Sequence, residues 1–150
     1  MDYKSQQNKI QKLACGALFV TPKKTVLLNL RASHKTHRNE WSLFGGMIDE
    51  DETPKQALDR ECLEEMGFVP SVMKTYPFDI YESKDKSFRY YTFICIVEEE
   101  FLPKLNHESA GYAWFKFEQG WPKPMHSGVR NSLCTQKGLA LLEIILSQHQ

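Results

Sequence analysis

The stretch from residue 45 to residue 68, GGMIDEDETPKQALDRECLEEMGF, constrains the fold more than any other part of the chain. It carries the signals of a helix start, because Thr53 suits the N-cap, Pro54 suits the first helical position and Gln56 completes a Thr-x-x-Gln capping box. Gly67 then provides a C-terminal stop. The sequence therefore predicts a helix between these signals, entered through an acidic loop from a tight Gly-Gly corner.

Three glutamates of this helix share one side. At about 100° per residue, Glu61, Glu64 and Glu65 occupy an arc of about 100°. The apolar residues are predicted to lie opposite, and they are Leu58, Cys62, Leu63 and Met66. A solvated amphipathic helix is the ordinary explanation of a Glu-rich helix, but like charges at this spacing cost roughly 0.2–0.5 kcal/mol per pair. A divalent cation such as Mg²⁺, which takes oxygen ligands, would remove that repulsion.

The same stretch resembles the Nudix box, G-x5-E-x7-R-E-U-x-E-E-x-G-U, in which U is an apolar residue. The fixed positions are all filled, by Gly46, Glu52, Arg60, Glu61, Glu64, Glu65 and Gly67. Cys62 and Phe68 occupy the two apolar positions. Two departures are mild, because Cys62 replaces the usual aliphatic residue and Phe44 stands where many members have proline. The resemblance implies the Nudix fold, an α/β/α sandwich of the α+β class.

The rest of the chain predicts a mixed sheet and one further helix. Strands are expected over 13–20, 25–30, 70–82, 87–98 and 111–117. A C-terminal helix is expected from 129 to 147, broken near Gly138. We therefore expect a single domain over residues 1–150, with residues 1–11 loosely ordered. In this domain a mixed β-sheet is flanked by the box helix and the C-terminal helix.

Composition argues against several functions. The 19 basic residues balance the 19 acidic ones, so bulk electrostatics give no strong nucleic-acid signal. The 4 cysteines are too scattered for a zinc site and are expected to be reduced thiols. We see neither a signal peptide nor an apolar run of membrane-spanning length. These features predict a cytoplasmic protein without a membrane partner.

The chemistry of the carboxylates and the resemblance together suggest a metal site. Glu61 and Glu65 would bind Mg²⁺ directly, with Mn²⁺ as an alternative ion. Glu64 would share a second ion or hold its water, and the backbone carbonyl of Gly46 would complete the site. A catalytic base is also needed to activate water, and either Glu108, in a loop before the last strand, or Glu61 could supply it.

Residues beside the carboxylates are expected to position them and the substrate. Arg60 cannot bind a cation, so its guanidinium would serve catalysis by orienting Glu52 or a neighbouring glutamate through a bidentate bond. Arg31, at the end of a predicted strand, is a candidate for binding substrate phosphate. Phe44, directly before the Gly-Gly corner, is a second candidate for substrate binding.

The resemblance implies a Mg²⁺-dependent pyrophosphohydrolase. Its small-molecule substrate would be a nucleoside diphosphate linked to another moiety, such as a nucleotide sugar, ADP-ribose, a dinucleotide or an oxidised nucleoside triphosphate. A non-catalytic module that senses a nucleotide or a partner is the main alternative, and a prenyl-diphosphate isomerase, which would need a cysteine at the pocket, is a third. The sequence leaves open whether the chain forms a homodimer.

Overall fold

The computed structural model describes residues 11–150, so the expected loose order of residues 1–11 lies outside the described residues except for Gln11. The strands are β1 (Lys12–Val20), β2 (Thr25–Arg31), β3 (Trp41–Ser42), β4 (Phe44–Met47), β5 (Lys74–Glu82), β6 (Phe88–Ile96) and β7 (Ser109–Lys116). The helices are α2 (Pro54–Met66), α3 (Ser127–Ser132) and α4 (Gln136–Ser147), with a short 3₁₀ helix, η1 (Phe117–Gln119).

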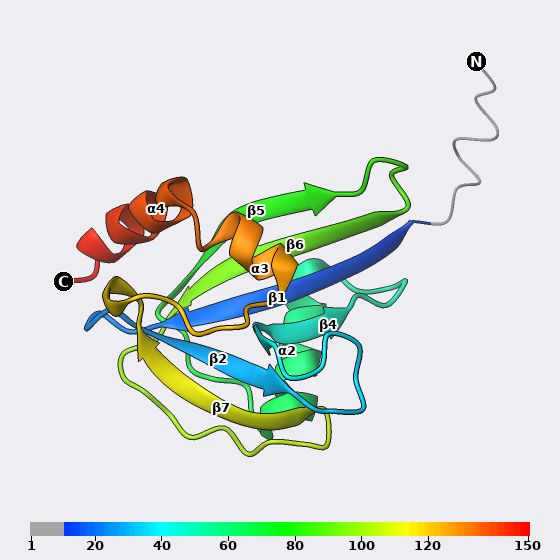
Figure 1. Cartoon of the computed structure of the whole chain (residues 1–150), viewed down its shortest axis with the longest axis horizontal. Helices are drawn as coiled ribbons and strands as arrows, with labels where there is room; N and C mark the ends of the chain where they lie inside the picture. The colour runs from blue at the N-terminus through cyan, green and yellow to red at the C-terminus, as the bar shows by residue number, and fades with distance from the viewer. Residues whose placement is uncertain (1–10) are drawn as a thin grey trace.

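The strands form one 7-stranded mixed sheet with the order β3-β2-β1-β6-β5, while β4 pairs with β1 and β7 pairs with β2 (Figure 1). β1 runs parallel to β6, and the other pairs are antiparallel. Along its opposite edge β1 changes partner. Ala14 to Ala17 pair with β4, whereas Phe19 and Val20 pair with β2. The sheet therefore branches at β1, between β4 and β2.

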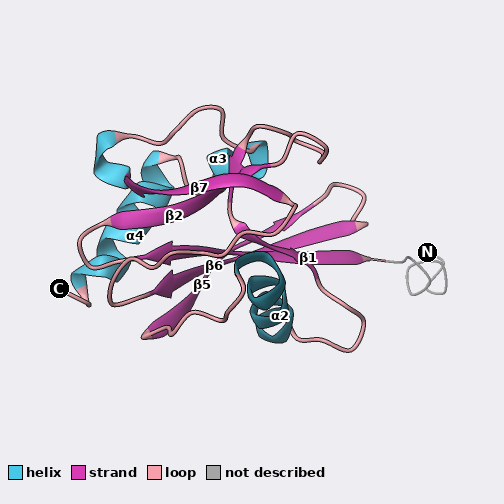
Figure 2. Ribbon diagram, turned by 90° about the horizontal axis from the view of Figure 1, so that it is seen from below, coloured by secondary structure: helices cyan, strands magenta, loops and turns pink. Residues whose placement is uncertain are grey.

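The two faces of the sheet carry separate cores. Cys15, Ala17 and Phe19 of β1 pack toward α2, whereas Leu18 and Val20 pack toward α3 and α4. This alternation follows from the two-residue period of a strand that is buried on both sides. Figure 2 shows α2 on one side of the sheet and α4 on the other. The predicted α/β/α sandwich with a mixed sheet is thus confirmed.

Helix α2 begins and ends where its sequence signals predicted. The Thr53 hydroxyl accepts a hydrogen bond from the backbone N–H of Gln56 at 3.1 Å, and the Gln56 side chain accepts one from the Thr53 N–H at 2.9 Å. Gly67 adopts a left-handed conformation with φ of 82° and closes the helix. The helix is therefore fixed at both ends by contacts between near neighbours in the chain.

The predicted division of α2 into opposite acidic and apolar sides is wrong in part. Glu65 is only 5% exposed, whereas Leu63 is 56% exposed. The two arcs are adjacent around the helix and not opposed, because Glu65 lies about 20° from Leu58 but about 100° from Glu64. Glu65 is therefore carried into the protein interior beside the apolar residues.

The C-terminal region forms two helices where one broken helix was expected. The break falls between α3 and α4 at residues 133–135, and Gly138 lies inside the first turn of α4. Thr135 caps α4 by accepting a hydrogen bond from the Gly138 N–H at 2.9 Å. The threonine cap, and not the glycine, therefore sets the start of α4. None of the helices within residues 11–150 is both long and apolar enough to cross a membrane.

Candidate active site

The Gly-Gly segment forms strand β4, which lies directly beside helix α2. Gly45 pairs with Gly16 of β1, and Gly46 pairs with Cys15. A Cβ atom added at Gly46 would lie 2.5 Å from Cδ of Glu61, which is too close for any side chain. Glycine at this position therefore allows the Glu61 carboxylate to rest against the backbone of β4.

Glu65 is a buried carboxylate held by the same strand. Its Oε1 accepts a hydrogen bond from the Gly45 N–H at 2.8 Å. Its pKa is raised to about 8, chiefly by burial and also by the charges of Glu61 and Glu108, while the Gly45 N–H and Arg31 oppose the shift. A positive charge brought beside Glu65 would lower this pKa and favour the ionised carboxylate.

The other two glutamates of α2 lie in different surroundings. The Glu61 side chain is 12% exposed, and burial raises its pKa against the opposing effect of Arg60. The Glu64 side chain is 54% exposed, and its Oε1 accepts a hydrogen bond from Arg60 Nη1 at 3.3 Å. Glu61 and Glu65 therefore face β4, whereas Glu64 lies at the outer side of the helix.

The guanidinium of Arg60 ties the acidic loop to the helix. Its Nε and Nη2 donate to Oε2 and Oε1 of Glu52 at 2.7 Å and 2.9 Å, which is the bidentate pair expected from the sequence. Nη2 also donates to the Met47 carbonyl at 2.9 Å, and Nη1 donates to Glu61 Oε1 at 3.1 Å. These contacts lower the pKa of Glu52 and raise that of Arg60. Arg60 thus holds β4, the loop and Glu61 in one arrangement.

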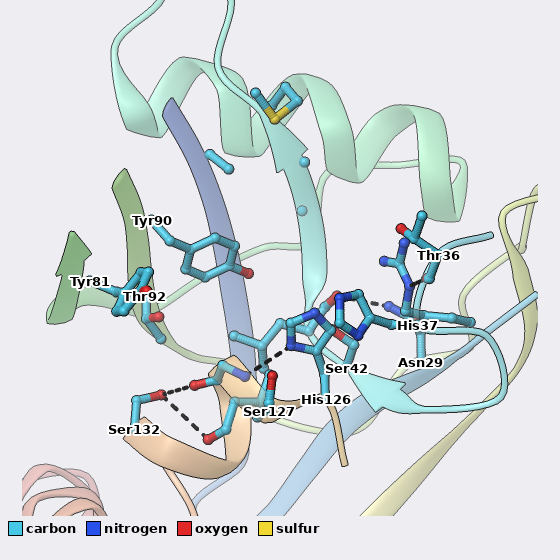
Figure 3. A pocket seen from close by; sticks show the side chains of 18 of the residues that line it. Asn29, Thr36, His37, Ser42, Tyr81, Tyr90, Thr92, His126, Ser127 and Ser132 are labelled. Carbon is cyan, nitrogen blue, oxygen red and sulfur yellow. Dashed lines mark hydrogen bonds between the residues drawn. The ribbon is translucent and has the colours of Figure 1, made fainter. Parts of the chain in front are cut away.

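A cavity of about 1000 Å³ opens beside β4, on the face of the sheet that carries α3 (Figure 3). We define its carboxylate end as Gly45, Gly46, Glu61, Glu65 and Glu108. We define its chamber as the part lined by Asn29, Ser42, Tyr81, Thr92, His126, Ser127, Asn131 and Ser132. The carboxylates of α2 are therefore accessible from a space large enough for a small organic ligand.

The loop before β7 brings a further glutamate to the carboxylate end. The Glu108 N–H donates to Asn106 Oδ1 at 2.9 Å, and its carbonyl accepts from the Ala32 N–H at 3.0 Å. Its carboxylate lies 3.6 Å from Nζ of Lys35. The charge of Glu108 also raises the pKa of both Glu61 and Glu65. The structure thus brings Glu108 together with these two residues, as the sequence suggested.

The two candidates for substrate binding have different outcomes. Arg31 lines the cavity, and its Nε donates to the Thr36 carbonyl at 2.7 Å. Phe44 is 0% exposed and packs beneath α2 with Ala57 and Leu58, so its assignment to substrate binding is wrong. The alternation of side chains along β4 turns Phe44 into the core, away from the cavity.

Several cavity residues were missed by sequence reasoning. The structure places Tyr81 of β5 and Tyr90 of β6 on the cavity. Asn29 and Thr92 line it as buried polar residues of largely apolar strands. An isolated polar residue within an apolar strand was therefore the available signal for the two latter positions.

None of the cysteines among residues 11–150 lines the cavity. Cys15, Cys62 and Cys95 are buried in the core beneath α2. Burial raises the pKa of Cys15 and of Cys95 to about 11 and raises that of Cys62 as well, so all three are protonated near neutral pH. The isomerase alternative lacks the pocket cysteine that it would need.

The family model of the NUDIX domain matches residues 11–136 of the chain. The chain belongs to the Nudix family. The matched region contains the Nudix box, the β4 strand and Glu108, so it includes all of the carboxylate end.

Individual relatives agree with this assignment. The dihydroneopterin triphosphate diphosphatase of Haemophilus influenzae is 35% identical over 89 residues, which cover 49% of this chain and 56% of that relative. The chain therefore spans just over half the length of this curated relative. The family match and the named hydrolases support the expected class of enzyme, a Nudix-type pyrophosphohydrolase.

Solved structures show the same fold. The Nudix hydrolase RenU from M. smegmatis has a TM-score of 0.68 at 25% identity and covers 93% of this chain and 87% of that chain. The NUDIX domain of Shewanella oneidensis NrtR, solved with ADP ribose, has a TM-score of 0.60 at 20% identity and covers 99% of this chain and 95% of that chain. At that identity the second likeness speaks for the fold alone.

Members of the Nudix family generally use divalent metals, and the Nudix box of this chain has suitable donor chemistry. Glu61 and Glu65 offer only oxygen atoms beside Gly46, and burial is the main cause of their raised pKa values, which a hard cation at this place would lower. Within residues 11–150, however, no three His, Cys, Asp or Glu side chains form a ready metal site. Glu64 is instead drawn to Arg60. The donor set fits a divalent ion, although the expected convergence of three glutamates is absent.

Proposed function

We propose that this chain is a Mg²⁺-dependent pyrophosphohydrolase, with Mn²⁺ as an alternative ion, that cleaves the diphosphate of a nucleotide or a nucleotide-like compound. One observation carries the proposal, namely that the buried Glu65 and the half-buried Glu61 of the Nudix box open onto a cavity of about 1000 Å³. Such a volume suits a nucleoside with an attached group. The carboxylate end would hold the diphosphate, and the chamber would hold the organic part.

Glu61 and Glu65 are the residues proposed to hold the ion, with the Gly46 carbonyl beside them and Glu64 as a further donor. When bound, a divalent ion neutralises charge on the phosphates and lowers the pKa of a coordinated water. Arg60 is proposed to position Glu61, because its Nη1 donates to Glu61 Oε1 at 3.1 Å.

We assign the role of general base to Glu108 in preference to Glu61. Glu61 Oε1 already accepts a hydrogen bond from Arg60 and is proposed as a metal donor. Glu108 lines the same end from a separate loop, and its Oε1 lies 3.6 Å from Nζ of Lys35. A water molecule that loses its proton to Glu108 would attack a phosphorus atom and break the P–O–P bond. The products are a nucleoside monophosphate and a phosphorylated second moiety, or pyrophosphate from a triphosphate.

Relatives suggest which substrates to test first. The Haemophilus influenzae relative is named for dihydroneopterin triphosphate, and two structural neighbours are named with ADP ribose, either as a ligand or in an ADP ribose pyrophosphatase. All of these compounds join a heterocycle to a chain of phosphates. A heterocyclic di- or triphosphate is therefore the proposed substrate class. We also propose that the protein works in the cytoplasm.

A substrate panel tests the proposal directly. Purified protein is incubated with nucleotide sugars, ADP-ribose, dinucleoside polyphosphates, dihydroneopterin triphosphate and oxidised nucleoside triphosphates, each with Mg²⁺, with Mn²⁺ and with EDTA. We expect phosphate-containing products from at least one compound, with no turnover in EDTA. Thermal stabilisation by a compound without any product formation would instead favour a nucleotide-sensing module.

A further inference from the structure

Tyr90 of β6 lies across strand β1 at the boundary between the carboxylate end and the chamber. A Cβ atom added at Gly16 of β1 would overlap the Tyr90 hydroxyl, so the phenol occupies the space left by that glycine. Figure 3 shows the ring of Tyr90 extending from β6 toward β4. The absence of a side chain at Gly16 therefore leaves room for the hydroxyl at this place.

The hydroxyl of Tyr90 makes no hydrogen bond within the described part of the chain, although it belongs to a residue that lines the cavity. The neighbouring Tyr91, on the opposite face of β6, accepts a hydrogen bond from Arg89 Nη1 at 3.3 Å. Tyr76 pairs its hydroxyl with His149 at 2.8 Å. Because Tyr90 lines the cavity, a ligand there can accept the hydrogen bond that its hydroxyl donates to no described residue.

The surroundings of this hydroxyl indicate what kind of ligand group it meets. Gly16, which it covers, pairs with Gly45, and the Gly45 N–H donates to Glu65. The charges of Glu65 and Arg31 both act on the phenol. Burial raises the pKa of Tyr90, so the hydroxyl keeps its proton and remains a donor at neutral pH. A neutral donor beside carboxylates suits an anionic oxygen that must approach them.

Arg31 provides a second donor toward the same region. Its Nε is engaged by the Thr36 carbonyl at 2.7 Å, while its terminal nitrogens make no hydrogen bond to residues 11–150. Arg31, Glu65 and Tyr90 all line the cavity, and the charge of Arg31 lowers the pKa of the other two groups. Within the described part of the chain, the terminal nitrogens of Arg31 and the hydroxyl of Tyr90 are thus free donors on residues that line the same cavity as Glu65.

We propose that the Tyr90 hydroxyl donates a hydrogen bond to a non-bridging phosphate oxygen of the substrate, at the phosphate that lies next to Glu61 and Glu65. This inference rests on the proposed function. A nucleoside base or sugar is the competing partner, but these groups would extend into the chamber once the diphosphate reaches the carboxylate end. Tyr90 would therefore fix how far the phosphates enter, and it would set substrate position without binding metal.

Binding of a small phosphate compound tests the inference without turnover. Methylenediphosphonate resembles a diphosphate but has no base, no sugar and no cleavable P–O–P bond. We expect Tyr90→Phe to weaken its binding about tenfold or more in calorimetry with Mg²⁺, which is the effect of losing a hydrogen bond to a charged group. Tyr91→Phe is the matched control, because it removes a hydroxyl from the same strand on the other face. This control should bind within about twofold of the wild type.

Adenosine, which has no phosphate, distinguishes the competing partner. Equal binding of methylenediphosphonate by the wild type and Tyr90→Phe would overturn the inference. The inference would also be overturned if Tyr90→Phe weakened the binding of adenosine but not that of methylenediphosphonate. A folded wild-type protein that does not bind methylenediphosphonate would overturn it as well. Thermal unfolding of both variants checks that the fold is kept.

The outcome is separable from that of the proposed function. If the wild type hydrolyses no compound of the panel but Tyr90→Phe still weakens methylenediphosphonate binding, the phosphate contact stands and the hydrolase proposal fails. If the wild type is an active hydrolase and Tyr90→Phe binds the compound normally, the hydrolase stands and the Tyr90 contact is rejected.

Discussion

The carboxylate end and the chamber of the cavity are built in different ways. At the carboxylate end only Glu108 comes from a separate loop, whereas Gly45, Gly46, Glu61 and Glu65 come from one stretch of sequence and are joined by short hydrogen bonds through Arg60 and the backbone of β4. The chamber collects residues from β2, β5, β6 and α3, which meet only in the folded protein. Few of their side chains bond to one another.

This difference in construction matches the different tasks proposed for the two parts, which are the reaction at the carboxylate end and recognition of the organic group in the chamber. The carboxylate end needs a fixed geometry, because a small displacement of a catalytic group costs a large factor in rate. The chamber needs only to fit an organic group, and single contacts there change affinity more modestly. Substitutions at the two places should therefore differ in size and in kind.

The largest effect is expected from removing a charge at the carboxylate end. Glu61→Gln and Glu65→Gln should each reduce the Mg²⁺-dependent rate by about a thousandfold or more, because they remove the negative charge proposed to hold the ion. In the Glu65→Gln variant the side-chain amide oxygen can still accept from the Gly45 N–H, so the fold should be kept. Steady-state kinetics measure the rate of each variant, and thermal unfolding measures whether its fold is kept.

Asp59→Asn is the matched control on the same helix. The Asp59 side chain is 45% exposed and pairs with Lys55 at 2.6 Å. Its substitution should leave the rate within about twofold of the wild type. Near-normal turnover of both the Glu61 and the Glu65 variants would contradict the proposal that the carboxylate end carries the reaction and the chamber carries only recognition.

The second prediction concerns the close approach of Glu61 to β4. Gly46→Ala should reduce the rate about a hundredfold, because the added Cβ would lie 2.5 Å from Cδ of Glu61 and force that carboxylate to move. Gly111→Ala in β7 is the control, since an added Cβ there has no atom within 4 Å. Equal rates for the two variants would show that the position of Glu61 is not critical.

A third and smaller effect tests the bidentate pair of Arg60. Arg60→Lys keeps the charge but cannot form two parallel bonds to Glu52 while also reaching Glu61. The Mg²⁺ concentration for half-maximal rate should rise about tenfold, as is typical when a group that orients a metal ligand is altered. An unchanged Mg²⁺ dependence would mean that Glu61 is oriented without Arg60.

The smallest effect is expected in the chamber, at His126. Its neutral ring caps α3 by accepting from the Gly128 N–H at 3.1 Å, and it lies 4.2 Å from the ring of His37. Burial lowers its pKa, as do His37 and Arg31, while Glu40 opposes the shift. The folded protein therefore binds this proton less readily than the unfolded chain. Stability from this group is present above pH 6.5 and is lost as the pH falls through the lowered pKa.

The His126→Asn substitution tests whether protonation of His126 causes this loss of stability, because it keeps a helix cap but removes the titrating group. Asparagine can still cap the helix but does not take up a proton. Protonation of His126 removes the ring nitrogen that accepts from the Gly128 N–H, and loss of such a cap costs about 1 kcal/mol. We therefore expect the wild type to lose about 1 kcal/mol more than the variant on acidification. Chemical unfolding at pH 7 and pH 5 should show a smaller loss of stability for the variant than for the wild type. An identical pH dependence would exclude His126 as the group involved.

What could be predicted from sequence follows the same division. The ends of α2 were predictable because Thr53, Gln56 and Gly67 act on near neighbours in the chain. The Arg60–Glu52 pair was predictable because both residues belong to the same short stretch. Residue types with a fixed spacing suffice for such local features. The role of each glutamate was less predictable, because Glu64 and Glu65 differ in burial only through what packs against each side of the helix.

The chamber could not be predicted, because its residues meet through strand pairing. Phe44 was misassigned because its neighbours in sequence reach the cavity, whereas the alternation along β4 directs it to the core. Tyr90 and Tyr91 are adjacent in sequence and chemically alike, yet they lie on opposite faces of β6. Only the register of that strand with β1 decides which of them meets a ligand.

The parallel pairing of β1 with β6 has a consequence for how the protein folds. These strands pair from Lys12 with Phe88 to Val20 with Ile96, although a long part of the chain lies between them. Closing so long a loop is slow compared with forming a capped helix. A chain that has been synthesised only as far as the end of the Nudix box therefore already carries all of the box glutamates. It still lacks β6, whose residues line the cavity in which a substrate would bind.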